Sequence, residues 1–181
     1  MRLIYYRYEE IKKIVVNFFE RYRINCTPIS GFEIALRMNI KVIPYSAYPM
    51  ATRILMEKES EDGFSIKKGK QWYIYYNDLK PYPYDRINFT IMHEIGHILL
   101  NHKEESQIAE LEANFFTKFA LAPPVLIHKY NLKNVFEVSS RFAISYEAAR
   151  YAFSYYEKWL NYGGEYYTDY EVRLCEIFGI A

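Results

Sequence analysis

Hydrophobic and polar positions follow a helical rhythm at both ends of the chain and a β-like rhythm in a short middle part. Residues 4–23 repeat apolar side chains at three- and four-residue steps, which predicts an amphipathic helix, and residues 31–39 suggest a second helix. Residues 40–48, 64–68 and 70–78 are rich in aromatic and β-branched side chains, which favour strands. A Lys-Gly pair between the last two segments predicts a hairpin.

From residue 85 onward the spacing of apolar side chains is helical again. Breaks in this helical pattern are expected near residue 103, at Pro123 and Pro124, around residues 131–134, and at Gly163 and Gly164. No internal repeat or low-complexity linker divides the chain. The pattern therefore predicts a single α+β domain over residues 1–181, mostly helical, with a small β-sheet preceding the helix that begins near Asp85.

Charge and cysteine content narrow the possible functions. The chain carries 23 basic and 22 acidic residues, a net charge of +1, so it has no overall electrostatic footprint for nucleic acid or an anionic membrane. Cys26 and Cys175 lie far apart in the sequence, which is typical of free thiols in a reducing compartment. The N-terminal segment lacks the apolar core of a signal peptide, and no later segment is apolar enough to span a bilayer. We therefore expect a cytoplasmic protein without a membrane partner.

The predicted helix after Asp85 contains the motif His-Glu-Ile-Gly-His at residues 93–97, the short pattern of zinc hydrolases. Residues four apart on a helix differ by about 40° in direction, so His93 and His97 share a face and can bind one Zn²⁺ ion. Glu94 can lie beside the open position of the metal and act as general base. An apolar stripe would hold this helix in the core: Ile87, Ile91, Ile95 and Ile98. The alternative is a buried helix whose histidines only satisfy hydrogen bonds.

A third metal ligand must come from elsewhere. His102 lies five residues after His97, about 140° away on a regular helix, so it cannot join the pair. The next predicted helix begins with Ser106 as N-cap and carries Glu110, which can bind zinc. Asn114, one turn further on, can then support a ligand histidine by a hydrogen bond. The predicted apolar stripe of this helix is Ile108, Leu111, Phe115 and Phe119.

Two glutamates of this helix compete for the role of third ligand. Glu112 points roughly 200° away from Glu110 on a helix, so the two cannot both bind the metal. For either glutamate the alternative is an ordinary place on a solvated helix face.

The stretch RINFTIMHEIGHILLNH, residues 86–102, followed by ELEANFFTKFALAPP, residues 110–124, resembles the ImmA/IrrE family of zinc metallopeptidases. The resemblance implies zinc ligands at His93, His97 and Glu110 and the catalytic glutamate at Glu94, with Glu112 as third ligand if the register of the motif is shifted. It also implies a zincin-like core over residues 1–125 and a helical extension, residues 126–181, packed on it.

The same resemblance implies a function. Members of the family are cytoplasmic zinc endopeptidases that cleave helix-turn-helix repressors and so switch on stress-response or mobile-element genes. The segment before the predicted sheet is too short for the N-terminal helix-turn-helix domain that many members carry. We therefore expect a stand-alone anti-repressor whose partner, a helix-turn-helix repressor, is encoded separately.

Two other function classes are compatible with parts of the sequence. Residues 135–153 resemble a DNA-binding helix-turn-helix, but residues 145–153 offer one basic side chain, Arg150, where a recognition helix needs several polar and basic ones. Direct nucleic-acid binding is therefore not expected. A non-catalytic module that keeps the metal site and only binds a regulator is the second alternative. No residue is assigned to stabilising the oxyanion.

Overall fold

The computed structural model describes residues 3–104, 106–164 and 166–180, and it divides the chain into two compact units. The sheet unit is Ser30–Glu104, and the helical unit combines Met1–Ile29 with Glu105–Ala181. The ends of the predicted domain, residues 1, 2 and 181, lie outside the described residues. The predicted boundary at residue 125 between a core and an extension stays a prediction.

The sheet unit contains three strands and four helical segments. In chain order they are α2 (Gly31–Arg37), β1 (Lys41–Pro44), the 3-10 turn η1 (Tyr45–Ala47), α3 (Met50–Glu59), β2 (Gly63–Lys68), β3 (Gln71–Tyr76) and α4 (Tyr84–Leu99). The strand order is β1-β3-β2, with β1 parallel and β2 antiparallel to β3. The hairpin predicted between residues 64–68 and 70–78 is confirmed, and its turn uses Gly69 at φ 62°.

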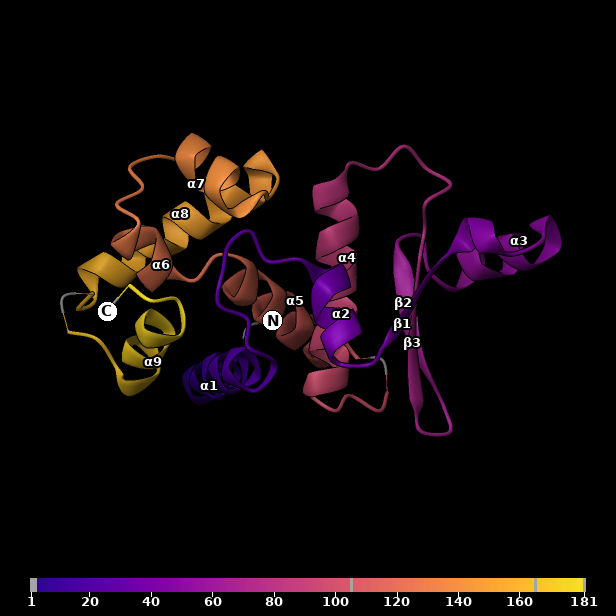
Figure 1. Ribbon diagram of the computed structural model, residues 1–181, viewed down its shortest axis with the longest axis horizontal. Helices are drawn as coiled ribbons and strands as arrows, with labels where there is room; N and C mark the ends of the chain where they lie inside the picture. Colours follow the sequence, from indigo (N-terminus) through magenta and orange to yellow (C-terminus); the bar gives the residue numbers. More distant parts are fainter. Residues whose placement is uncertain (1–2, 105, 165, 181) are drawn as a thin grey trace. The chain divides into compact units, whose positions relative to one another are not determined.

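Helix α4 packs on one face of this sheet, and α3 lies on the other side (Figure 1). Gly63 permits the close approach of α4, because a Cβ there would stand 2.7 Å from Cγ2 of Thr90 and 2.6 Å from the backbone oxygen of Tyr75. Helix α2 packs on α4 in the same way, since a Cβ on Gly31 would stand 2.9 Å from Cγ2 of Ile91. The helix with the metal motif is therefore clamped between the sheet and α2.

Helix α3 was not predicted from the sequence. It buries only Met56, which joins Tyr45 and Tyr75 in a small apolar cluster on the second face of the sheet. Met50 and Leu55 are exposed by 76% and 65%. Because most apolar side chains of α3 point to solvent, the segment lacks the apolar periodicity by which a helix is recognised.

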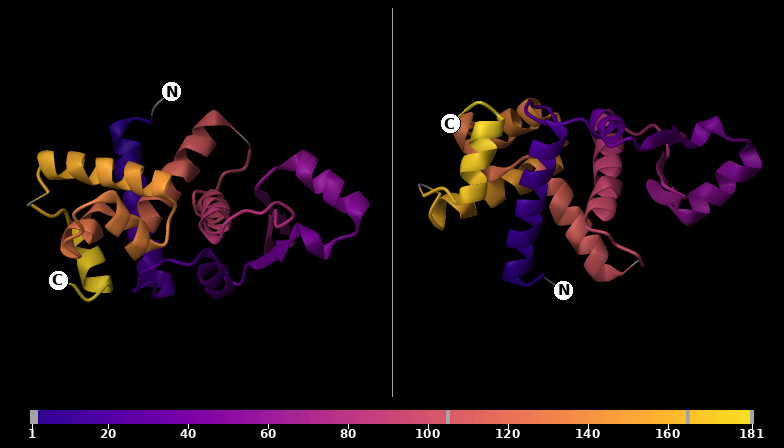
Figure 2. Two further views of the ribbon diagram at one scale, coloured as in Figure 1. Left: turned by 90° about the horizontal axis from the view of Figure 1, so that it is seen from above. Right: turned by 60° about the horizontal axis from the view of Figure 1, so that its bottom comes forward.

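The helical unit contains α1 (Tyr5–Tyr22), α5 (Gln107–Leu121), α6 (Pro124–Lys129), α7 (Val135–Phe142), α8 (Tyr146–Asn161) and α9 (Asp169–Ile177). Both views in Figure 2 show α1 between α5 and α9, and α1 packs on each of them. Helix α8 packs on α5, α6 and α7. The predicted break at Pro123 and Pro124 coincides with the start of α6, and the break at residues 131–134 falls between α6 and α7.

Helix α5, which carries Glu110, is more deeply buried than α4, which carries the two histidines. Its N-cap is Ser106, as predicted, whose hydroxyl accepts a hydrogen bond from the backbone N–H of Ala109 at 3.1 Å. The predicted stripe is correct for Phe115 and Phe119 but wrong for Ile108, which is 50% exposed. Small and aromatic residues fill the rest of the buried surface: Ala109, Ala113, Phe116 and Ala120. The helix contacts other helices on more than one side, which an amphipathic pattern does not anticipate.

The architecture confirms the predicted fold class. The described chain is α+β and mostly helical, and its small mixed sheet precedes the helix with the His-Glu-x-x-His motif. None of the described helices has the length and apolar character needed to cross a membrane.

Candidate metal centre

Helix α4 brings the two motif histidines together. Nε2 of His93 and Nε2 of His97 lie 3.0 Å apart, and the rings meet at 68° with their centroids 4.7 Å apart. Two nitrogens bound to one tetrahedral zinc ion at about 2.0–2.1 Å stand about 3.3 Å from each other. The observed separation is close to that value, so the spacing of the two nitrogens is compatible with a shared zinc ion.

Buried and charged contacts fix the direction of α4. Ile91 and Ile95 are fully buried, and the side-chain oxygen of Asn88 accepts a hydrogen bond from the backbone N–H of Gly31 at 2.6 Å. In the first turn, the guanidinium of Arg86 donates to both carboxylate oxygens of Asp62, at 2.8 and 3.0 Å. A ligand helix held on several sides presents its histidines in one orientation, which a catalytic site requires.

Glu94 is buried on the same helix, with 8% of its surface exposed. Burial raises the pKa of the nearby Tyr45 phenol, and the negative charge of Glu94 raises it further. The phenol therefore stays protonated, and it donates a hydrogen bond to the backbone oxygen of Ser60 at 3.1 Å. A carboxylate shielded from bulk water, on the same helix as two neighbouring imidazoles, is a residue type that can act as a general base.

The two competing glutamates of α5 have different environments. Glu112 is buried, and Arg7 of α1 holds it in a two-pronged ion pair, with Nε donating to Oε1 at 2.8 Å and Nη2 to Oε2 at 2.5 Å. This pair raises the pKa of the Arg7 guanidinium. Glu110, in the first turn of α5, is exposed. The Glu112 carboxylate is therefore engaged within the helical unit, whereas Glu110 points away from its core.

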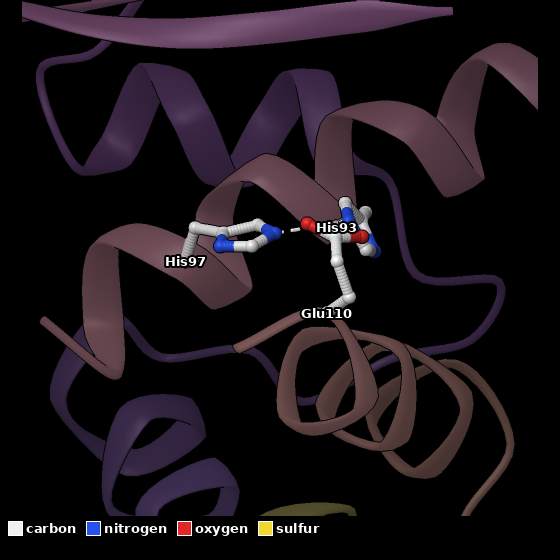
Figure 3. A group of neighbouring side chains, drawn as sticks. All are labelled: His93, His97 and Glu110. Atoms are coloured by element: carbon white, nitrogen blue, oxygen red, sulfur yellow. Dashed lines mark hydrogen bonds between the residues drawn. The ribbon is translucent and has the colours of Figure 1, made fainter. Parts of the chain in front are cut away.

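Glu110 completes a donor set of two imidazoles and one carboxylate. Among the described residues, one ligand atom from each of His93, His97 and Glu110 lies within 4.8 Å of the other two (Figure 3). Two histidines and a glutamate are the protein ligands of one group of catalytic zinc sites, which leave a fourth position open. The residue types and the spacing of the nitrogens thus fit zinc.

Asn114 was expected to form a hydrogen bond with a ligand histidine, but its side chain bonds elsewhere. The side chain of Asn114 donates to the backbone oxygen of Glu110 at 2.8 Å and so stays along α5. The contact with a histidine ring comes from His102, whose Nδ1 lies 3.0 Å from Nδ1 of His97. The sequence did contain a signal for this contact, because Asn101 is a residue type that ends helices in the left-handed conformation.

The remaining candidates lie in the helical unit. His128 contacts the hydroxyl of Tyr156 at 3.1 Å within an aromatic cluster. The helices α7 and α8, which cover the segment that resembles a DNA-binding motif, pack on each other, and their buried residues are Val138, Phe142, Ala149 and Ala152. These contacts give the pair a role in the core of the helical unit.

Comparison with known proteins places these features in a family. A search of curated proteins finds no match. The family model described as the IrrE N-terminal-like domain, Peptidase_M78, matches residues 37–154, about two thirds of the chain. The match covers the sheet, the helix with the two histidines and the helix with Glu110. The chain therefore belongs to the ImmA/IrrE family of metallopeptidases, peptidase family M78.

Proposed function

We propose that this protein is a zinc-dependent endopeptidase in which His93, His97 and Glu110 bind the metal and Glu94 is the general base. The observation that carries the proposal is the pair of Nε2 atoms 3.0 Å apart on a clamped helix, on which the buried Glu94 directly follows His93. Membership in a metallopeptidase family supports the same reaction type.

The choice of Glu110 over Glu112 rests on charge. A carboxylate that binds zinc must give up its other partners, and Glu112 is already neutralised by Arg7. Taking the buried carboxylate out of this pair would cost several kcal/mol, although the guanidinium would keep its second contact with Glu10. Glu110 is not part of the Arg7 pair, so metal binding by Glu110 would not break that pair. Its place in the first turn of α5 leaves the carboxylate accessible.

Each residue of the site has one task in peptide hydrolysis. Bound zinc supplies a Lewis acid that polarises the scissile carbonyl and makes water a nucleophile near neutral pH. Glu94 accepts a proton from the attacking water at its carboxylate and then delivers that proton to the amine that leaves. His93 and His97 hold the reacting centre at a fixed distance from Glu94, because all three residues lie within five positions of α4.

The substrate we propose is a helix-turn-helix transcriptional repressor, whose cleavage would derepress stress-response or mobile-element genes. Family membership supports a peptidase-type role, and the choice of a repressor as substrate follows from the resemblance of residues 86–102 and 110–124 to the ImmA/IrrE motifs. We place the reaction in the cytoplasm, where Cys26 and Cys175, both free thiols, would remain reduced.

The test is cleavage of purified candidate repressors, resolved by gel and mass spectrometry. The zinc-loaded protein should cut such a repressor at a defined bond, a chelator should stop the reaction, and added Zn²⁺ should restore it. As a matched control, the exposed Glu176→Gln variant should cut at the wild-type rate. Binding of the repressor without cleavage, at saturating zinc, would favour the non-catalytic alternative.

A further inference from the structure

The contact between His102 and His97 has a geometric origin in the end of α4. Helix α4 ends at Leu99, and Asn101 adopts the left-handed conformation at φ 56°. The backbone N–H of His102 then donates to the oxygen of His97 at 3.1 Å, and that of Asn101 to the oxygen of Ile98 at 3.2 Å. This pair of bonds defines a Schellman motif, which turns the chain back over the last helical turn.

In a Schellman motif the second residue after the cap packs against the residue five positions before it, and the contact is usually hydrophobic. Here those two positions are His102 and His97. Their rings meet at 74° with centroids 5.0 Å apart, and their Nδ1 atoms lie 3.0 Å from each other. The helix end therefore replaces an apolar contact with a hydrogen bond between two imidazoles.

We propose that His102 is a positioning residue, which accepts a hydrogen bond from Nδ1–H of His97 and so fixes the tautomer and orientation in which His97 offers Nε2 to the metal. The proposal rests on the proposed function, since it takes His97 as a zinc ligand. His102 is not itself a ligand, because its ring contacts the nitrogen of His97 that faces away from His93.

The chemistry follows from the two nitrogens of an imidazole. A neutral histidine carries its proton on one nitrogen and a lone pair on the other. If Nδ1–H of His97 donates to His102, the lone pair must lie on Nε2, the atom that faces His93. Ligating histidines commonly make such a contact through the second nitrogen, and its removal typically weakens metal binding 10–100-fold.

Two pairs of variants separate this role from general stability. His102→Leu removes the acceptor, whereas His102→Asn keeps an acceptor oxygen close to the place of Nδ1. Asn101→Gly preserves the left-handed turn, whereas Asn101→Val disfavours it and displaces the unmodified His102. His128→Leu is the matched control, because it removes a histidine of the helical unit.

The measurement is the zinc dissociation constant, by competition with a chromophoric chelator, together with ¹H–¹⁵N spectra that report the tautomer of His97 in the zinc-free protein. We expect His102→Leu and Asn101→Val to bind zinc about 10–100-fold more weakly. Asn101→Gly and His128→Leu should stay within about threefold of wild type, and His102→Asn should recover most of the loss. The Nδ1–H form of His97 should dominate in wild type and decline in His102→Leu.

Two results would overturn the inference. The first is a His102→Leu variant that binds zinc as wild type does, with an unchanged His97 tautomer. The second is an equal loss of affinity in the His128→Leu control. Neither result would touch the proposed function, because wild-type zinc binding and cleavage would stand. A wild-type protein that binds no zinc would instead overturn the proposed function, and this inference with it.

Discussion

Arg7 and Glu112 lie 105 positions apart in the sequence and form a two-pronged ion pair that joins α1 to α5. Glu112 is buried and Arg7 is partly buried, with 9% and 28% of their side chains exposed. The pair ties the buried side of α5, the helix that carries Glu110, to α1. It also neutralises the second acidic side chain near the proposed third ligand.

Removing the guanidinium should destabilise the helical unit. Arg7→Leu leaves the Glu112 carboxylate buried without its main partner, and breaking a buried pair costs about 3–5 kcal/mol. Because Arg7 is partly exposed, we expect a loss of about 2–3 kcal/mol in the free energy of unfolding, measured by urea titration. The double variant Arg7→Leu/Glu112→Leu should recover most of this loss. A single variant as stable as wild type would show that the pair contributes little.

The two glutamates should respond differently to loss of charge. Glu110→Gln should weaken zinc binding more than about 100-fold, beyond the 10–100-fold effect of an outer contact. Glu112→Gln should leave the zinc dissociation constant within about threefold of wild type while lowering stability. Isothermal titration with Zn²⁺ measures the affinities. The opposite ranking would assign the third ligand to Glu112.

A side chain at position 63 should disturb the packing of α4 on the sheet. Gly63→Ala places a Cβ within 3 Å of the Tyr75 backbone and of Thr90, and overpacking of this kind costs about 1–3 kcal/mol. Gly69→Asn is the control, because Asn tolerates the left-handed conformation and a Cβ there meets no atom within 4 Å. Thermal unfolding should separate the two variants, and equal melting temperatures would contradict the proposed packing.

Stability should fall at alkaline pH. Burial raises the pKa of the Tyr170 phenol from 10.0 to about 12. A group with a raised folded pKa contributes stability that is complete below the unfolded pKa and is lost as pH rises through the folded one. The free energy of unfolding should therefore decline between pH 10 and pH 12, by roughly 2–3 kcal/mol for this group. Tyr170→Phe should flatten the decline, and an identical slope in that variant would exclude Tyr170 as its source.

The sequence predicts most of the fold because its apolar spacing and turn residues are local signals. The hairpin of β2 and β3, the first helix and the two ligand helices all follow from such signals. Helix α3 does not, because it exposes Met50 and Leu55 and buries only Met56. The apolar stripe predicted for α5 is wrong at Ile108, which is 50% exposed in the first turn of the helix, and it leaves out Ala113 and Phe116, which are buried.

The candidate site was predictable where one helix supplies the residues. His93, Glu94 and His97 follow from a single motif on α4, and helix geometry alone relates them. The contact of His102 does not follow from regular helix geometry, because Asn101 adopts the left-handed conformation and turns the chain back. The role of Arg7 could not be seen at all, because nothing local relates a residue of α1 to Glu112.

The most direct test of the account is the rate of peptide hydrolysis by Glu94→Gln at equal zinc occupancy. Glutamine keeps the shape of the side chain but cannot accept the proton of the attacking water. The account predicts one zinc ion per chain in both proteins and a loss in the cleavage rate of about 10²–10⁴-fold in the variant, the contribution of a general base. A zinc-loaded Glu94→Gln protein that cleaves at the wild-type rate would contradict it.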